Sequence, residues 1–412
     1  MAEQETIAVL GAGVIGSAIA CALALEGRHV LLIDRAPPGE AGASFGNAGH
    51  IATELVEPLP SPALLFGFWR ELFAFGGVLD LPPRRLLKFL PWGARFARAA
   101  FRRDENTRHL APFVRPAATA LADMLGEIGR ADLMRQHGHY EMWLGGDVAR
   151  RARLQALAME KLEVLTQPAP AELVESARRA ARADTAAGLH FPNCAHVVDP
   201  LEVVRAFASA ATARGASFMQ RDVRALQTGA AGIQIITDAG PIAARSAIVC
   251  AGVWSAPLLA PFGLRAPLEA ARGYHVQMPG ATPLVDAPIL YSDASILVTP
   301  MAGRVRATSF MEFAGTDAPP DPRKPLWLRD KLRDLGYPCE DQPPSWVGSR
   351  PVLPDYLPAI GRVAAAPNLL YAFGHQHIGL TLAAITARTM ADLVAGRKPG
   401  VDVSAFDLKR WS

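Results

Sequence analysis

The sequence predicts an α/β protein that combines a parallel sheet near the N-terminus with a second domain built on a mixed or antiparallel sheet. Residues 7–34 read as strand, glycine-rich turn, helix and second strand, the order of a parallel β-α-β unit. Residues 265–313 alternate apolar and polar side chains between frequent turns, a pattern typical of antiparallel strands. Small-residue junctions recur near residues 44–49, 251–252 and 374–379. We therefore expect the chain to return to the first sheet several times, which makes the first domain discontinuous in sequence.

The segment from Ile7 to Asp34 carries the pattern of a dinucleotide-binding unit. A short apolar run suits a buried parallel strand, and Gly11, Gly13 and Gly16 follow it in the spacing G-x-G-x-x-G. The first glycine allows the tight turn, the second lets a pyrophosphate approach the backbone, and the third lets the helix pack closely on the sheet. Asp34 follows Gly16 by 18 positions, where a carboxylate can accept both ribose hydroxyls. The pattern predicts a Rossmann-like domain with a dinucleotide at the N-terminus of its first helix.

The uncharged run from Ile7 to Leu25 has an alternative interpretation as a signal peptide or a membrane span. A signal peptide needs a basic region before its apolar core, and here Glu3 and Glu5 precede the run without lysine or arginine. A spanning helix would not place three glycines at a nucleotide-binding spacing within its first turns. The sequence therefore favours the dinucleotide-binding unit, and the cytoplasm is the expected location.

Composition sets broad limits on function. The chain has 412 residues, of which 50% are hydrophobic and 20% charged, as expected for a globular protein of two or three domains. The net charge of +3 is too balanced to indicate nucleic-acid binding. The four cysteines lie far apart without a C-x-x-C pair, which argues against zinc, iron–sulfur clusters and a disulfide framework. We therefore expect no metal site and a reducing compartment.

Local patterns place the remaining elements in order. Helical patterns run to about residue 129, a strand is expected over 138–144, and helices are expected over 148–165 and 171–183. Asp199 is placed to cap the helix that runs to Thr212. Further along, the patterns predict strands over 217–225, 233–237, 247–250 and 369–373, one helix within 317–344, and a last helix over 380–395. These elements divide the chain into a nucleotide-binding domain of residues 1–58, 198–264 and 345–412 and a substrate domain of residues 59–197 and 265–344.

Four motifs together resemble one enzyme family over almost the whole chain. Besides the N-terminal fingerprint they are the loop 43–49 (ASFGNAG), the segment 248–255 (IVCAGVWS), and the paired segments 348–351 (GSRP) and 374–381 (GHQHIGLT). The chain resembles the D-amino-acid oxidase family of FAD-dependent oxidoreductases. Within that family it is most similar to the bacterial D-amino-acid dehydrogenases of the small-subunit type and to the D-hydroxyproline dehydrogenases.

The resemblance implies that the dinucleotide is FAD, and the recurrence of small-residue junctions along the chain favours FAD over NAD. The position that resembles the attachment site of histidine-linked members holds Gly46 and Asn47, which favours non-covalent binding, with His50 as a loop residue near the ring. The dipole of the last helix, which begins near Gly379, would stabilise negative charge on the reduced flavin. The expected cofactor-binding residues are Gly11, Gly13, Val14, Ile15, Gly16, Asp34, Arg35, Ser44, Gly46, Asn47, Ala48, Gly49, His50, Val223, Ala251, Gly252, Trp254, Gly348, Arg350, Gly374, His377, Ile378, Gly379, Leu380 and Thr381.

The resemblance also implies oxidation of the C–N bond of a small or cyclic D-amino acid, with the electrons passing to a non-oxygen acceptor such as a quinone. A bidentate guanidinium holds a carboxylate best, and Arg350 matches the family's carboxylate-binding arginine. Tyr274, His275 and His377 are the other catalytic candidates, and the further pocket candidates are Tyr291, Glu312 and His375. Two alternatives stay open: a glycine- or sarcosine-type oxidase that uses O₂, and a flavin-carrying electron-transfer subunit of a hetero-oligomer.

Residues 64–103 interleave aromatic and basic side chains. A basic, aromatic, amphipathic stretch can lie on an anionic membrane surface, which would place the protein at the inner face of the cell membrane and suit a quinone acceptor. The other interpretation is a helical cap that packs its aromatic side chains on the substrate domain and turns its arginines to water. The cap accounts better for the bulk of the segment, and both interpretations remain open at this point.

Overall fold

A computed structural model describes residues 5–229 and 232–411. Its first sheet has six strands in the order β10 (Ser217–Gln220), β2 (Val30–Asp34), β1 (Ile7–Leu10), β14 (Ser246–Val249), β21 (Leu369–Phe373) and β20 (Ala359–Arg362). The first five strands are parallel, and β20 joins the edge antiparallel to β21. The predicted parallel sheet near the N-terminus is therefore confirmed, and strands from distant parts of the chain build it.

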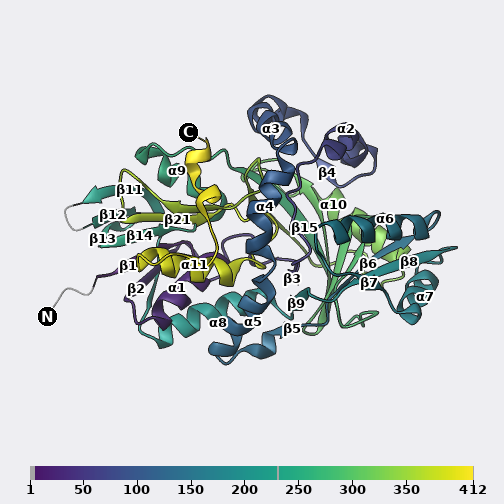
Figure 1. The fold of residues 1–412 in the computed structure, drawn as a ribbon. Helices are drawn as coiled ribbons and strands as arrows, with labels where there is room; N and C mark the ends of the chain where they lie inside the picture. The colour runs from purple at the N-terminus through teal and green to yellow at the C-terminus, as the bar shows by residue number, and fades with distance from the viewer. Residues whose placement is uncertain (1–4, 230–231, 412) are drawn as a thin grey trace.

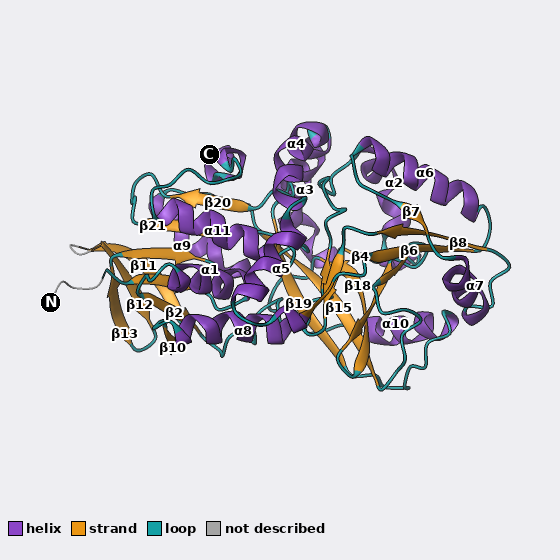
Figure 2. Ribbon diagram, turned by 60° about the horizontal axis from the view of Figure 1, so that its bottom comes forward, coloured by secondary structure: helices purple, strands orange, loops and turns teal. Residues whose placement is uncertain are grey.

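Helices cover one face of this sheet, and a small sheet covers the other. Helices α1 (Val14–Leu25), α8 (Pro200–Ala213) and α11 (Ala383–Val394) pack together, and α5 (Ala117–Glu127) packs on α11 (Figure 2). The opposite face meets the antiparallel strands β11 (Val223–Gly229), β12 (Gly232–Thr237) and β13 (Gly240–Ala244). Central strands buried on both faces explain why β1 and β14 consist largely of apolar residues.

The second sheet has nine strands and is mixed, as the sequence predicts. Its main path is β19 (Ser345–Val352), β15 (Glu269–Pro279), β18 (Arg304–Glu312), β17 (Ile296–Met301), β16 (Ile289–Tyr291), β6 (His139–Leu144), β8 (Ala186–Phe191) and β7 (Gln167–Pro168), and β4 (Leu79–Asp80) pairs with β18. Only the β16–β6 and β18–β4 pairs are parallel among the described pairs of this sheet. Helices α6 (Val148–Lys161), α7 (Ala171–Ala180) and α10 (Arg323–Asp334) pack on it (Figure 1).

Shorter elements connect the two sheets. Strands β3 (His50–Ile51), β9 (Ala195–Val197) and β5 (Met134–Arg135) form a small sheet between them (Figure 1). Helices α2 (Pro62–Glu71), α3 (Leu86–Ala100) and α4 (Arg103–Val114) follow one another along the chain, and α9 (Ser255–Leu259) follows β14. This arrangement brings loop 44–54 between the two sheets.

Two segments lie differently from the sequence-based division, and the last helix begins later than expected. Phe113 at the end of α4 and Leu121 of α5 belong to the same apolar core as α1, although residues 59–197 were assigned to the substrate domain. Strand β19 pairs with β15 in the mixed sheet, although residues 345–412 were assigned to the nucleotide-binding domain. The last helix begins at Ala383, after a turn over residues 376–382. Hydrophobic periodicity identifies a buried face, but it does not say which of two cores buries it.

Candidate active site

One large cavity lies where the two sheets meet, with a volume of about 650 Å³. The glycine-rich turn after β1 lines one part of it, and Arg350 of β19 with the turn before α11 lines another. Residues from both sheets and from loop 44–54 complete the wall. The cavity therefore contains the N-terminal and C-terminal motifs that the sequence singled out.

Each of the three fingerprint glycines is required for a different structural reason. Gly11 has φ +109°, and a Cβ on it would lie 2.5 Å from the carbonyl oxygen of Cys250. A Cβ on Gly16 would lie 1.8 Å from the carbonyl oxygen of Gly11, so this glycine lets the helix close against its own turn. At Gly13 the nearest atom to such a Cβ is Ser44 Oγ at 3.3 Å. The space beside Gly13 is thus the one that a phosphate group can approach.

Asp34 closes the same turn from the end of β2. Its Oδ2 accepts a hydrogen bond from the Ala12 amide at 2.6 Å, and its Oδ1 accepts one from the Ala36 amide at 3.3 Å. Next to it, the Arg35 guanidinium lies 3.9 Å from the centre of the Trp254 ring. All three side chains belong to residues that line the cavity, so a carboxylate and a stacked cation–aromatic pair meet beside the glycine-rich turn.

Loop 44–49 is held by hydrogen bonds to the start of α1 and to two strands of the mixed sheet. Ser44 Oγ accepts from the Val14 amide at 2.9 Å, which fastens the loop to the start of α1. Arg306 Nη1 donates to the Asn47 carbonyl at 2.6 Å. His275 Nδ1 lies 2.9 Å from the Gly46 carbonyl, and burial lowers the pKa of His275 to about 3, so the neutral imidazole donates this bond. The structure thus places His275 behind the loop and not among the residues that line the cavity.

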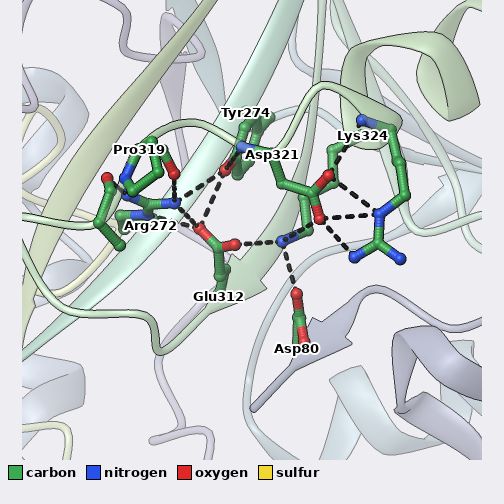
Figure 3. A network of polar contacts seen from close by, with 9 residues as sticks. Asp80, Arg272, Tyr274, Glu312, Pro319, Asp321 and Lys324 are labelled. Atoms are coloured by element: carbon green, nitrogen blue, oxygen red, sulfur yellow. Dashed lines mark hydrogen bonds and ion pairs between the residues drawn. The ribbon is translucent and has the colours of Figure 1, made fainter. Parts of the chain in front are cut away.

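Tyr274 lines the cavity, but its hydroxyl belongs to a buried ion network (Figure 3). The hydroxyl donates to Glu312 Oε2 and accepts from Arg272 Nη2 and from the Asp321 amide, each at 3.0 Å. Burial raises the pKa of Tyr274 to about 12. Glu312, a further pocket candidate, forms ion pairs with Arg272 and Lys324 and does not line the cavity. Tyr291, another pocket candidate, does not line it either, and its hydroxyl is hydrogen-bonded to that of Tyr337.

Arg350 reaches the cavity from β19 and rests on a glycine of the neighbouring strand. A Cβ on Gly273 would lie 2.0 Å from Arg350 Nη2, so the guanidinium occupies the space that any side chain at residue 273 would fill. Arg350 Nη1 donates to the Phe310 carbonyl at 2.8 Å, and burial lowers the pKa of Arg350. Phe310 has φ 72°, an unfavourable value for a bulky residue. The carbonyl of the strained residue Phe310 binds the guanidinium, and the absence of a side chain at Gly273 leaves room for it.

The turn before α11 brings three polar side chains to the cavity. His375 Nε2 lies 3.1 Å from Thr386 Oγ1, while burial followed by the nearby Arg350 charge lowers the pKa of His377 to about 4. Gln376 has φ 49°, and its buried side-chain oxygen and nitrogen have no hydrogen-bond partner among the described residues. An unpartnered buried amide is costly unless a ligand completes it, so Gln376 is suited to a polar group of a bound molecule.

The structure brings most of the predicted site residues to one cavity. Of the catalytic candidates, Arg350, Tyr274 and His377 line it. Among the cofactor candidates, those that do not line it are Gly16, Gly49, Ile378 and Thr381. Thr381 lies behind the wall, where its Oγ1 accepts from the Ala52 amide at 3.0 Å. Gly49 packs against Val197 and Met301, where a Cβ would lie 3.0 Å from each.

Several lining residues could not be singled out from the sequence. Trp346 lies against both Gly46 and Gly348, since a Cβ on either would come within 2.0 Å of the indole ring. Ser295, Phe310 and Gln376 line the cavity with positive φ, and no pattern in the sequence marks that conformation outside glycine. Other lining residues that the sequence did not single out include Glu54, His139, Arg221, Asp222, Leu297, Thr308 and Met311.

A second group of titratable side chains gathers on the wall beside loop 44–49. His50 Nε2 lies 3.8 Å from Glu54 Oε1, and the His50 and His139 rings are 4.6 Å apart. Burial lowers the pKa of His50 to about 3 and that of His139 well below its usual range, and burial raises the pKa of Glu54 to about 7. Both imidazoles are therefore neutral at physiological pH.

Comparison with known proteins finds one family over most of the chain. A family model described as FAD dependent oxidoreductase matches residues 6–393. A D-amino-acid oxidase of Bradyrhizobium diazoefficiens is 30% identical over 431 residues, covering 100% of both chains. A D-amino acid dehydrogenase of Paramagnetospirillum magneticum is 29% identical, covering 98% of this chain and 99% of that protein. The glycine oxidase of Geobacillus kaustophilus has a similar fold, with a TM-score of 0.75 at 21% identity over 98% of this chain and 99% of that one.

Proposed function

The chain belongs to the D-amino-acid oxidase family of FAD-dependent oxidoreductases, and from this premise we propose that it oxidises the C–N bond of a small or cyclic D-amino acid to the imine. D-Proline, D-hydroxyproline and D-alanine are the proposed substrate types, and a non-oxygen acceptor takes the electrons. The relatives named D-amino-acid oxidase and D-amino acid dehydrogenase support the substrate class. The observation that carries the proposal is the Arg350 guanidinium, positioned in the cavity by Gly273 and Phe310.

The residues around the cavity fit non-covalent FAD. The side of Gly13, where a Cβ would have only Ser44 Oγ within 4 Å, suits the pyrophosphate, and the carboxylate of Asp34 suits the ribose. The unpartnered amide of Gln376 suits a polar ring edge. Gly46 and Asn47 supply no histidine or cysteine for a covalent link. FAD, when bound, supplies a ring atom that accepts a hydride from the substrate carbon.

The chain's own residues have to orient the substrate for that transfer. A guanidinium presents two parallel N–H donors, so Arg350 can hold a carboxylate in a fixed plane, and its charge is least screened in a buried cavity. Neutral His377 can accept a hydrogen bond from the substrate amine without adding a second positive charge. Holding both groups fixes the Cα–H direction, which is the main contribution a protein makes to such a reaction.

Anaerobic mixing with candidate substrates tests this function. Purified yellow protein is mixed with D-proline, D-hydroxyproline, D-alanine, their L-enantiomers, glycine and sarcosine, and the flavin absorbance is followed. We expect bleaching with one of the three D-amino acids, none with its L-enantiomer, and slow return of colour when air is admitted. Bleaching by glycine or sarcosine with fast recovery in air would indicate the amine oxidase. No bleaching with any compound would indicate an electron-transfer subunit.

Replacing Gly273 with alanine tests the carboxylate-binding geometry while residue 350 remains an arginine. The new methyl group would overlap Arg350 Nη2 and shift the guanidinium. We expect KM for the amino-acid substrate to rise about 10-fold or more, the equivalent of one weakened charge-assisted hydrogen bond, with FAD content unchanged. Steady-state kinetics at full flavin occupancy measure the change. Gly126→Ala is the matched control, since a Cβ there meets nothing within 4 Å. An unaltered KM in Gly273→Ala would contradict the proposal that Arg350 binds the substrate carboxylate.

Residues 64–103 pack some of their large apolar side chains against the protein and expose others to solvent. Trp92 is buried and stacks on Phe96 with their ring centres 5.2 Å apart, which agrees with the cap interpretation for the buried face of α3. Phe66, Leu87 and Phe101 are 80%, 82% and 72% exposed, and Trp69, Phe75 and Leu90 are also exposed. The segment has eight arginines and lysines against two acidic residues. Among the described residues, no helix has the length and hydropathy needed to cross a membrane.

We propose that this exposed surface contacts an anionic lipid bilayer, since its apolar side chains and basic charges complement such a membrane. The double variant Phe66→Ser/Leu87→Ser is expected to reduce binding to phosphatidylglycerol vesicles about 30-fold in sedimentation assays, since each side chain contributes on the order of 1 kcal/mol when it inserts. Leu154→Ser is the control, because Leu154 is 56% exposed on α6. Equal sedimentation of all three proteins, or none by the unmodified protein at low salt, would contradict the proposal.

A further inference from the structure

Four side chains with metal-binding donor atoms converge beside loop 44–49. His50 on β3, Glu54 in the turn after it, His139 on β6 and Cys194 between β8 and β9 each offer one donor atom, and these atoms all lie within 4.8 Å of one another. The four residues come from three separate stretches of the chain. Only the fold brings them together, at the small sheet that joins the two larger ones (Figure 1).

The group is buried and incompletely bonded. The side chains of His50, His139 and Glu54 are 9%, 2% and 10% exposed, and Cys194 is 3% exposed. His50 Nε2 has no hydrogen-bond partner among the described residues, although it lies 3.8 Å from Glu54 Oε1. His139 Nε2 lies 4.0 Å from the same carboxylate oxygen. Both distances are too long for hydrogen bonds. His50 Nε2 and His139 Nδ1 are thus buried nitrogens without a hydrogen-bond partner among the described residues, a costly arrangement unless a ligand or ion completes the group.

We propose that His50, Glu54, His139 and Cys194 bind one Zn²⁺ ion as a closed four-ligand structural site. Two imidazoles, a thiolate and a carboxylate are the donors that zinc prefers, whereas calcium and magnesium take mainly oxygen ligands. Zn–N bonds of about 2.0 Å and Zn–S bonds of about 2.3 Å place tetrahedral donors about 3.3–3.7 Å apart. The observed spacing needs a contraction of about 1 Å, which side-chain rotations can supply.

Charge balance also favours zinc in this buried place. A thiolate and a carboxylate carry two negative charges, and the two imidazoles are neutral, so a divalent cation makes the whole site neutral. At present the Cys194 thiol donates to Glu54 Oε2 at 3.0 Å. When the Sγ–zinc bond forms, that proton leaves to solvent and no oxidation state changes.

A second group of possible metal ligands, made of carboxylates alone, lies among the described residues and shows the contrast. Asp80, Glu312 and Asp321 also lie within 4.8 Å of one another. Their cluster already holds the Lys324 ammonium, which bonds Asp80 at 2.6 Å and also contacts Glu312 (Figure 3). A metal ion would have to displace a buried lysine there. The His50–Cys194 group contains no such resident cation.

The site would fix one wall of the cavity. His50, Glu54 and His139 line the cavity, while Cys194 lies behind them. Because four protein ligands leave zinc no open position, the ion acts as a clamp between loop 44–54, β6 and the β8–β9 turn. It binds no substrate and takes no part in the proposed oxidation.

Metal analysis and cobalt substitution of the FAD-loaded protein test the proposal. We expect about one zinc per chain by mass spectrometry after growth with zinc. We also expect a thiolate-to-cobalt charge-transfer band and visible bands of tetrahedral intensity when Co²⁺ replaces zinc, read as difference spectra against the flavin. These readouts do not depend on catalytic activity, so failure of the proposed function would leave them unchanged.

Matched variants identify the ligands. Cys194→Ser and Glu54→Gln are each expected to weaken zinc binding by at least about 10-fold, since even outer partners of metal ligands have effects of that size. Cys194→Ser should also abolish the charge-transfer band. Cys339→Ser replaces another buried cysteine and should change neither readout. Glu54→Gln serves if Cys194→Ser does not fold, as judged by flavin content and circular dichroism.

Two results would overturn the site. One is FAD-loaded protein that takes up neither zinc nor cobalt at micromolar concentration. The other is uptake with a cobalt spectrum that Cys194→Ser and Glu54→Gln leave unchanged, which would assign the metal to surface histidines such as His109 or His137.

Discussion

Replacing Arg350 with lysine is expected to lower kcat/KM for the D-amino-acid substrate by about 10²–10⁴-fold. A bidentate guanidinium–carboxylate pair contributes two charge-assisted hydrogen bonds, each of about 1.5–3 kcal/mol, and a lysine ammonium cannot reproduce that planar geometry. The loss should appear in both kcat and KM, because the same contact binds the substrate and aims its Cα–H bond. Steady-state and single-turnover flavin reduction measure the two effects.

A substrate without a carboxylate isolates the role of Arg350. For a cyclic amine such as pyrrolidine, the unmodified protein is expected to be slow, and Arg350→Lys should add little further loss. FAD content should match that of the unmodified protein, and Arg388→Lys, an exposed arginine paired with Asp123, is the control. Equal losses for the amino acid and for the plain amine would show that Arg350 acts on the cofactor or the fold and not on the carboxylate.

The glycine-rich turn could be predicted from the sequence because local constraints fix its conformation. Gly11 has to adopt positive φ and Gly16 has no room for a side chain, so the spacing of these glycines encodes a specific turn. The predicted family and its FAD cofactor are confirmed by the family match over residues 6–393. Asp34 follows at the end of the next strand, a position set by the length of one β-α-β unit.

The proposed substrate end of the cavity was less accessible to sequence reasoning, because its geometry depends on neighbours across strands. Arg350 was found through its motif, but the support from Gly273 and Phe310 arises only when β19, β15 and β18 pair. The positive φ of Gln376 leaves no mark in the sequence, since non-glycine residues reach that region only where the surroundings enforce it.

Tyr274 and His275 show how alternation along a strand can mislead. Adjacent residues of a strand point to opposite faces, so the two side chains cannot share one pocket. The structure places Tyr274 at the cavity wall with its hydroxyl in the ion network, and His275 against Gly46 and Trp346 on the other face. Which face meets the cavity depends on the tertiary arrangement of the sheets and not on the pattern itself.

The ion network behind Tyr274 yields the second large expected effect. Glu312→Gln is expected to destabilise the protein by about 3–5 kcal/mol and to lower Tm on the order of 5–10 °C. Glu312 is 3% exposed and contacts the guanidinium of Arg272 and the ammonium of Lys324, which is 0% exposed (Figure 3). Removing its charge leaves two buried cations with fewer counter-charges. Thermal release of FAD fluorescence measures the shift, with Glu160→Gln on the surface of α6 as the control.

A double variant separates charge imbalance from loss of packing at Glu312. If the penalty comes from an uncompensated cation, Glu312→Gln/Lys324→Met should be more stable than Glu312→Gln alone, because the second change removes one of the two buried positive charges. Asp80 would then lose its lysine partner, but it lies closer to solvent and can regain water. If the double variant is instead less stable by the sum of both single losses, the network stabilises the protein through separate local contacts. Recovery in the double variant would therefore show that β4, β15, β18 and α10 are held together, behind the wall formed by Tyr274, by balanced charge.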